Sequence, residues 1–169
     1  MSPVVVLVGP PGAGKTTVAG ELGRRLDVAV RDTDADVEAG EGLTVQDIFL
    51  THGEGRFREL ERDAVRDALA THDGVLALGG GAVTTEAVRE SLAGHRVVFL
   101  DVSLGESAAR VGLGTSRPLL LGNVRGTLKR LMDERRPLYT EVAALTVATD
   151  GLSPEQVAEH ILSELGEST

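Results

Sequence analysis

The amino-acid sequence predicts an α/β fold in which helices cover both faces of a parallel β-sheet. Short, mostly apolar segments alternate along the chain with segments of helical periodicity, and no repeat, linker or low-complexity tract interrupts them. With 169 residues, of which 41% are apolar and 25% charged, the chain is long enough for one well-buried core and short for two. We therefore expect a single domain that spans residues 1–169.

The apolar segments lack polar alternation, which is typical of strands buried on both faces. In chain order they are residues 4–8, 28–30, 75–78, 97–100 and 145–148. Apolar residues at helical spacing predict a helix after the first segment and a long amphipathic helix over about 54–70. The helix-start signals are Thr84 or Thr85 before Glu86, Ser103 with Glu106 as a capping box, Asn123, and Ser153 before Pro154.

The first strand leads into the sequence GPPGAGKT, which matches the pattern G-x-x-x-x-G-K-[ST] over residues 9–16. Its place between a strand and a helix is the context that a phosphate-binding P-loop requires. Glycines let backbone N–H groups turn toward phosphate oxygens, Lys15 can span the β and γ phosphates, and Thr16 can supply an oxygen to Mg²⁺. The nucleotide-binding residues that we predict here are Gly12, Ala13, Gly14, Lys15, Thr16 and Thr17.

Composition excludes several classes of function. The formal net charge of −9 argues against a nucleic-acid surface, because phosphate backbones are bound by clustered Lys and Arg. The chain has no cysteine, which excludes disulfides and fits a reducing compartment. The first apolar segment is too short to span a bilayer, so we expect no membrane segment and a cytoplasmic protein. GTP recognition by Asn-Lys-x-Asp is excluded because Asn123 is the only asparagine and no lysine follows it.

Three aspartates follow predicted strands. Asp32 and Asp34, at i and i+2 beyond the second apolar segment, can point the same way from one edge of the sheet, where open α/β folds bind ligands. A D-x-D pair is otherwise as often a solvated turn. Asp101 ends the run VVFLD, which looks like a Walker B strand, yet no glutamate follows it. It is therefore either a Mg²⁺ partner or a strand-end carboxylate.

Six short sequences, GPPGAGKTT, DTD, FRELE, LGGGAV, RPLL and RRPLY, occur in an order and spacing that resemble shikimate kinase over essentially the whole chain. The resemblance implies transfer of the γ-phosphoryl group of ATP to the 3-hydroxyl of shikimate, on the route to aromatic amino acids. It also implies a nucleoside monophosphate kinase-like P-loop fold, a three-layer sandwich with a five-stranded parallel sheet. The substrate-binding region is then about 32–61, and a lid loop, expected to be mobile, about 112–123.

The resemblance also assigns roles to individual residues. It makes Asp34 the residue that hydrogen-bonds the acceptor hydroxyls, and Asp32 a Mg²⁺ partner together with Thr16. Arg117 becomes the lid arginine that closes over the phosphates, with Lys15 and Asp34 as the other catalytic residues. The predicted adenine contacts are Arg110 and Pro154.

Shikimate carries a carboxylate, for which guanidinium groups are the expected anchors. The resemblance offers Arg58, for which the alternative is a surface salt bridge with Glu61. It also offers Arg135, which fits R-x-P-L-Y better than Arg136 does, because a residue before proline is pushed out of the helical region. The run Gly79, Gly80 and Gly81 would lie against the ligand, where any Cβ would occupy its space. The alternative is a tight turn that needs positive φ.

Two other functions share parts of this pattern. Another small P-loop kinase, acting on gluconate or a nucleoside monophosphate, would keep the P-loop and lid without needing Arg58, the glycine run and Arg135. A catalytically inactive nucleotide-binding module is disfavoured by the joint presence of five residues that folding alone does not require: Lys15, Thr16, Asp32, Asp34 and Arg117. We expect a monomer, because nothing in the sequence marks a large self-association surface.

Overall fold

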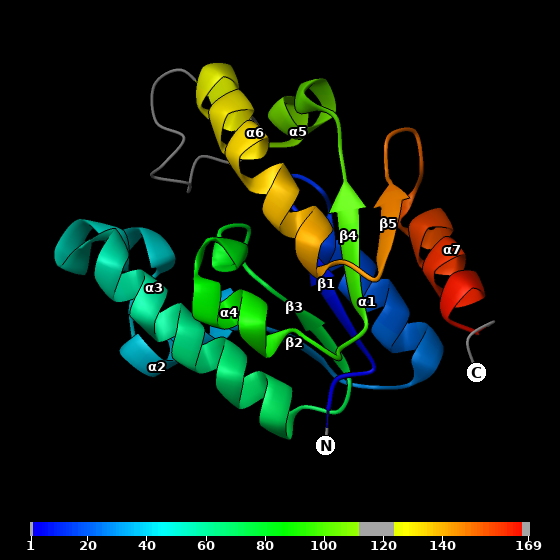
Figure 1. The fold of residues 1–169 in the computed structure, drawn as a ribbon, viewed down its shortest axis with the longest axis horizontal. Helices are drawn as coiled ribbons and strands as arrows, with labels where there is room; N and C mark the ends of the chain where they lie inside the picture. The colour runs from blue at the N-terminus through cyan, green and yellow to red at the C-terminus, as the bar shows by residue number, and fades with distance from the viewer. Residues whose placement is uncertain (1, 112–123, 167–169) are drawn as a thin grey trace.

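The computed structural model describes residues 2–111 and 124–166 of the chain. Its strands form one sheet in the order β2-β3-β1-β4-β5, and every neighbouring pair is parallel (Figure 1). The strands are β1 (Val5–Val8), β2 (Val30–Asp32), β3 (Val75–Ala77), β4 (Val97–Asp101) and β5 (Leu145–Ala148). The predicted five-stranded parallel sheet is therefore confirmed.

Helices cover both faces of the sheet (Figure 1). They are α1 (Lys15–Leu26), α2 (Thr33–Glu41), α3 (Val45–Thr71), the 3-10 turn η1 (Ala82–Thr84), α4 (Glu86–Ser91), α5 (Leu104–Val111), α6 (Val124–Val142) and α7 (Pro154–Gly166). Val5 and Leu7 of β1 pack with α1 and α7, whereas Val6 and Val8 pack with α3, α4 and α6. This alternation produces the predicted three layers, because successive strand residues face opposite sides.

The region between β2 and β3 differs most from the sequence prediction. The strand begins at Val30 instead of residue 28, and it lies at the edge of the sheet. Helix α2 was not predicted, and α3 begins at Val45, well before residue 54. Gly53, at φ 83°, interrupts α3 and separates its first turns from the predicted amphipathic helix. Sequence periodicity registered only the part after this kink.

The predicted helix starts are confirmed in part. Ser153 and Gln156 form a reciprocal capping box at the start of α7, with bonds of 3.1 and 2.9 Å. Ser103 accepts from the N–H of Glu106, but its own N–H donates to Asp150, so the predicted box with Glu106 is incomplete. Thr85 lies at the N-cap of α4 without a side-chain bond, and Asn123 lies outside the described residues.

The carboxyl ends of the parallel strands meet at one edge of the sheet, where ligands bind in open α/β folds. At that edge β1 leads into the P-loop, β2 into Thr33 and Asp34, and β3 into the glycine run. Within residues 2–111 and 124–166, no helix has the length and apolar character needed to cross a membrane.

Candidate active site

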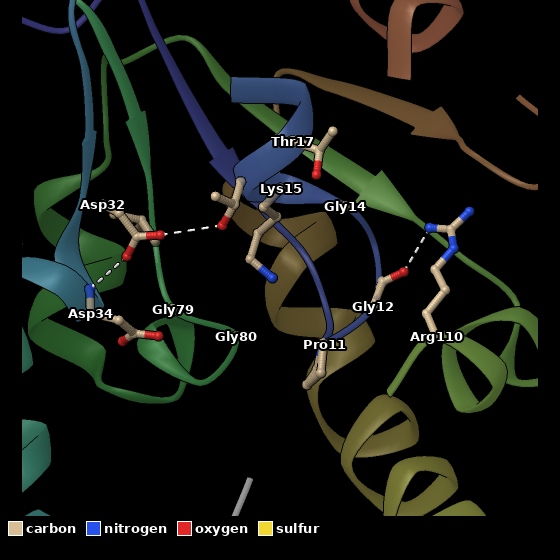
Figure 2. Close-up of a pocket in the computed structure, with 12 residues that line it drawn as sticks. Pro11, Gly12, Gly14, Lys15, Thr17, Asp32, Asp34, Gly79, Gly80 and Arg110 are labelled. Carbon is tan, nitrogen blue, oxygen red and sulfur yellow. Dashed lines mark hydrogen bonds between the residues drawn. The ribbon is translucent and has the colours of Figure 1, made fainter. Parts of the chain in front are cut away.

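A cavity of about 270 Å³ lies between the P-loop, the ends of β2 and β3, and α5 (Figure 2). Its lining residues are Pro11, Gly12, Gly14, Lys15, Thr16, Thr17, Asp32, Asp34, Leu78, Gly79, Gly80 and Arg110. The fold thus brings the predicted nucleotide-binding residues and the first predicted acceptor residues to one space. Ala13 does not line this cavity, because its methyl group is buried in the core.

The P-loop has the backbone that phosphate binding requires. Gly12 and Gly14 adopt φ values of 78° and 86°, which L side chains rarely reach. The ammonium group of Lys15 donates to the carbonyl oxygens of Gly9 and Pro10, at 2.8 and 3.1 Å. Helix α1 begins at Lys15, so its N-terminal N–H groups lie beside this loop and add positive potential. The arrangement can receive the phosphates of a nucleotide.

Thr16 and Asp32 both line the cavity. The hydroxyl of Thr16 lies 3.4 Å from Oδ2 of Asp32 and donates to it. Two such oxygens fit a Mg²⁺ site, since Mg²⁺ takes one or two protein oxygens and completes its shell with water and phosphates. No cluster of three or more acidic, His or Cys ligands occurs among the described residues, so any metal here would also need ligands from the nucleotide.

Asp32 and Asp34 are close for a different reason than the sequence suggested. Asp32 ends β2 and caps helix α2: its Oδ1 accepts from the N–H groups of Asp34 and Ala35, at 2.8 and 3.3 Å. Asp34 lies in the first turn of α2, so a helix cap, and not the side-chain alternation of a strand, brings the two carboxylates together. The cap turns the chain so that both carboxylates still line the cavity.

Arg58 and Glu61 form a buried ion pair after the kink in α3. Arg58 Nη1 donates to Glu61 Oε1 at 2.8 Å, and the side chains are 15% and 1% exposed, so this is not the surface salt bridge that we considered. Burial raises the pKa of Glu61 to about 7; Asp34 raises it further, and Arg58 and Arg135 oppose the rise. Arg58 Nε and Glu61 Oε2 have no hydrogen-bond partner within the described part of the chain.

The glycine run is needed for close approach and not for turn geometry. None of its three residues has positive φ, so the tight-turn alternative is wrong. A Cβ on Gly79 would lie 2.5 Å from Oδ1 of Asp34, and one on Gly81 would lie 2.6 Å from Nη1 of Arg58. At Gly79 and Gly81 a Cβ would therefore displace candidate binding side chains, and the expectation that it would also occupy ligand space stays a prediction. Glycine lets the carboxylate of Asp34 and the guanidinium of Arg58 both lie against this backbone.

The two neighbouring arginines of RRPLY have different surroundings. Arg135 is 7% exposed, and it lies near the hydroxyl of Tyr139, whose pKa is raised by burial while the charge of Arg135 opposes that rise. Arg136 is more exposed, and it donates to Asp101 at 2.5 Å. This pairing fits the strand-end interpretation of Asp101. Helix α6 continues through Pro137, so the expectation that Arg136 leaves the helical region is wrong.

A second cavity of about 240 Å³ adjoins the P-loop on the side of α7. It is lined by Ala13, Gly14, Thr17, Val18, Arg110, Thr149, Leu152, Pro154 and Val157. The predicted adenine contacts Arg110 and Pro154 are thus brought together. Arg110 also donates to the carbonyl of Gly12 and to Glu106, both at 2.7 Å. Arg117 and the predicted lid, residues 112–123, lie outside the described residues.

Sequence reasoning missed three residues that support these loops. Thr33 is fully buried, and its Oγ1 accepts from the N–H of Gly79 at 3.3 Å. The buried hydroxyl of Ser107 donates to the carbonyl of Pro11 at 2.6 Å. The hydroxyl of Tyr139 donates to the carbonyl of Gly80 at 2.5 Å. Only Tyr139 carried a signal, because it is the sole tyrosine of the chain and ends the sequence RRPLY.

Comparison with known proteins points to one family. A family model described as shikimate kinase matches residues 11–166. The shikimate kinase of Thermobifida fusca is 56% identical over 163 residues, which cover 96% of this chain and 95% of the relative. The structure of shikimate kinase from Acinetobacter baumannii in complex with shikimate superposes with a TM-score of 0.95 at 34% identity, covering 100% of this chain and 95% of that one.

A more distant structure shares only the fold. The gluconokinase of Sinorhizobium meliloti superposes with a TM-score of 0.62 at 19% identity, covering 99% of this chain and 93% of that one. At this identity the architecture is common while the acceptor is not indicated.

Proposed function

The chain belongs to the shikimate kinase family, and on that premise we propose how its residues divide the work of the family's reaction. The protein is an ATP-dependent kinase that transfers the γ-phosphoryl group of ATP to the 3-hydroxyl of shikimate, in aromatic amino acid biosynthesis. We assign all of its chemistry to the carboxyl edge of the sheet, within one kinase domain.

The nucleotide side is the P-loop and its two adjoining cavities. The N–H groups of the loop and the ammonium of Lys15 hold the phosphates, and the base lies between Arg110 and Pro154. A Mg²⁺ ion, which Thr16 and Asp32 would hold, would supply charge neutralisation at the phosphates. The guanidinium of Arg110 donates to the carbonyl of Gly12 and to Glu106, and these bonds hold it beside the space that we assign to the base.

The acceptor side is formed by α2, α3, α6 and the glycine run. Arg58 and Arg135 are held close to Glu61, since both lower its pKa through their charge. Arg58 is paired with Glu61 and Glu54, whereas no ion pair of Arg135 with a carboxylate occurs among the described residues, so Arg135 can pair with an anionic ligand. We assign the carboxylate of shikimate to these two arginines, and the backbone of Gly79, Gly80 and Gly81 to the ring that lies beside it.

The carboxylate of Asp34 lies where the two sides meet (Figure 2). We assign it to the attacking 3-hydroxyl, which it orients by accepting a hydrogen bond. The hydroxyl oxygen then bonds to the γ-phosphorus while the bond from this phosphorus to the bridging oxygen of ADP breaks. Because phosphoryl transfer is loose, most of the rate comes from positioning and charge neutralisation, and the proton passes to Asp34 late.

The single observation that carries this assignment is the shared cavity. Pro11 of the P-loop and Gly80 of the glycine run lie in contact, since a Cβ on Gly80 would be 3.3 Å from Cδ of Pro11. A nucleotide in the P-loop and an acceptor on the glycine run are therefore direct neighbours. Correct positioning of the phosphoryl donor relative to the acceptor hydroxyl is the main requirement of phosphoryl transfer.

The test is turnover of Mg²⁺-ATP, measured as ADP release, with shikimate, gluconate, AMP, CMP or no acceptor. Rapid ADP formation with shikimate alone is the expected result. Turnover with another acceptor would refute the shikimate assignment and leave the nucleotide site standing. No turnover with any of them would favour an inactive nucleotide-binding module.

We further propose that the enzyme is a cytoplasmic monomer with no nucleic-acid or membrane partner. The exposed large apolar residues of the described ranges are scattered over different elements: Val4, Leu26, Val30, Leu50 and Leu152. Scattered single residues of this kind need no partner to cover them. Light scattering after size exclusion should give a mass near 17.7 kDa, and a dimer mass would refute the proposal.

A further inference from the structure

The carbonyl of Gly80 is held by a side chain from another layer of the fold. Gly80 is the middle residue of three glycines, whose backbone has more freedom than any other sequence would give. The outer two are fixed locally: the carbonyl of Gly79 accepts from Ala82, and that of Gly81 accepts from Thr84. The described bond to the carbonyl of Gly80 comes from the hydroxyl of Tyr139, at 2.5 Å.

Tyr139 is well placed to hold this bond. It is 1% exposed in α6, and its ring lies against Phe99 of β4 with centroids 5.0 Å apart. Burial raises the pKa of its hydroxyl to about 12, so the hydroxyl stays neutral and remains a donor at any working pH. The ring and the strand together fix the position of the oxygen.

The same oxygen also meets the second candidate anchor. Arg135 lies one helical turn earlier on α6, near enough to the hydroxyl of Tyr139 for its charge to oppose the rise that burial causes in the pKa of that hydroxyl. The hydroxyl therefore lies beside Arg135 while it donates its proton to the carbonyl of Gly80. Because a trans peptide is planar, fixing the carbonyl of Gly80 also fixes the direction of the N–H of Gly81.

We propose that Tyr139 is a positioning residue for acceptor binding, whose hydroxyl holds the Gly80–Gly81 peptide in a fixed orientation beside the guanidinium of Arg135. The proposal rests on the proposed function, in which these groups bind shikimate. It assigns the tyrosine of RRPLY a task that core packing alone does not require, since phenylalanine would fill the same space.

The test compares Tyr139→Phe with Phe99→Leu. The first removes only the hydroxyl, whereas the second weakens the ring contact and leaves the hydroxyl in place. For Tyr139→Phe we expect KM for shikimate to rise about 5- to 20-fold, consistent with losing one hydrogen bond, while KM for ATP stays within about twofold. Phe99→Leu should lower the unfolding midpoint and leave KM for shikimate within about twofold.

Two results would overturn the proposal. One is an unchanged KM for shikimate in Tyr139→Phe. The other is a parallel rise of both KM values, or the same rise in Phe99→Leu, because each indicates a structural role. Turnover of the wild-type enzyme with shikimate is measured first, so its absence would refute the proposed function separately.

A second measurement works even if Tyr139→Phe does not fold. Tyr139 is the only tyrosine, so labelling with ¹³Cζ-tyrosine gives a single NMR resonance, from the carbon that carries the hydroxyl oxygen of Tyr139. Saturating shikimate should shift this resonance, because a ligand bound to Arg135 and to the glycine run changes the surroundings of the Tyr139 hydroxyl, whereas gluconate should not. An unmoved resonance with shikimate, or an equal shift with gluconate, would overturn the proposal.

Discussion

The nucleotide side and the acceptor side of this active site are built in different ways. The nucleotide side is one contiguous loop whose backbone does most of the binding, and its glycines adopt positive φ. The acceptor side is assembled from charged side chains of α2, α3 and α6 around a glycine run with no positive φ. The comparison teaches that glycine serves conformation in the first loop and space in the second. Substitutions should therefore affect the two sides differently.

The largest effect that would sharpen this comparison is expected from Asp34→Asn. The change keeps the size of the side chain but removes the charge and the proton acceptor, so turnover should fall by at least ~100-fold, toward ~10⁴-fold. ATP affinity, measured by calorimetry, should stay unchanged because the P-loop is untouched. Asp36→Asn is the matched control: it lies on the same helix, pairs with Arg31, and should turn over normally. A near-normal rate in Asp34→Asn would remove Asp34 from the mechanism.

The next effect separates the two adjacent arginines of α6. Arg135→Ala should weaken shikimate binding by about 2 to 5 kcal/mol, because it removes a desolvated partner of the carboxylate. Arg136→Ala loses a partly exposed pair with Asp101 and should change binding by less than about 1 kcal/mol. Calorimetric titration with shikimate measures both. Equal and small effects would mean that the acceptor carboxylate lies elsewhere.

The nucleotide side and the acceptor side also differ in how much of each could be predicted from the sequence. The P-loop, β1 and β4 were predictable because a contiguous motif or an apolar run specifies them locally. Helix α2 was missed, since Asp32 and Asp34 were interpreted as a ligand-binding pair at a strand end, and the role of Asp32 as a helix N-cap was not recognised. The edge strand β2 was misplaced because two of its three residues, Arg31 and Asp32, are polar.

On the acceptor side, the burial and the hydrogen bonds of individual residues could not be predicted from the sequence. Burial of Glu61 depends on tertiary packing of α3 against α2 and the glycine run, which no local pattern reports. The same holds for the bond from Gly79 to Thr33, which lies between Asp32 and Asp34 in the sequence, and for the bond from Tyr139 to Gly80. The residues of this side were named from a family resemblance, whereas those of the P-loop were also derived from chemistry.

A third prediction uses the pH dependence that only the acceptor side should show. The pKa of Glu61 is raised from 4.5 to about 7 in the folded protein, so its protonated form favours folding. Its stabilising contribution is complete below pH 4.5 and is lost as the pH rises through 7. Glu61→Gln should therefore match wild type near pH 5 and exceed it by up to about 3 kcal/mol in unfolding free energy at pH 8.

Denaturant titrations at the two pH values measure this difference, and Glu54→Gln is its control. Glu54 also bonds Arg58, at 3.2 Å, but its side chain is 52% exposed. Its replacement should shift stability by less than about 1 kcal/mol, equally at both pH values. If the curves of Glu61→Gln and wild type run parallel from pH 5 to pH 8, Glu61 titrates as an ordinary carboxylate and the acceptor side has no unusual electrostatics.

The smallest effect tests whether the two sides are independent. Ser107→Ala removes the bond to the carbonyl of Pro11 and leaves that buried oxygen without it, which should raise KM for ATP about 3- to 10-fold. Ser103→Ala, a cap at the exposed start of the same helix, should lower stability without this change in KM. KM for shikimate should stay within about twofold in both.

The outcome bears on the contact between Pro11 and Gly80, through which a shift of the P-loop could reach the acceptor. If Ser107→Ala raises KM for shikimate as much as KM for ATP, a change in the P-loop also changes acceptor binding. The nucleotide side and the acceptor side are then coupled, although they are built differently. If only KM for ATP rises, the backbone of the P-loop absorbs the change before it reaches Gly80. The glycine run then depends on Thr33 and Tyr139 for its position, and the acceptor side is supported from its own layers of the fold.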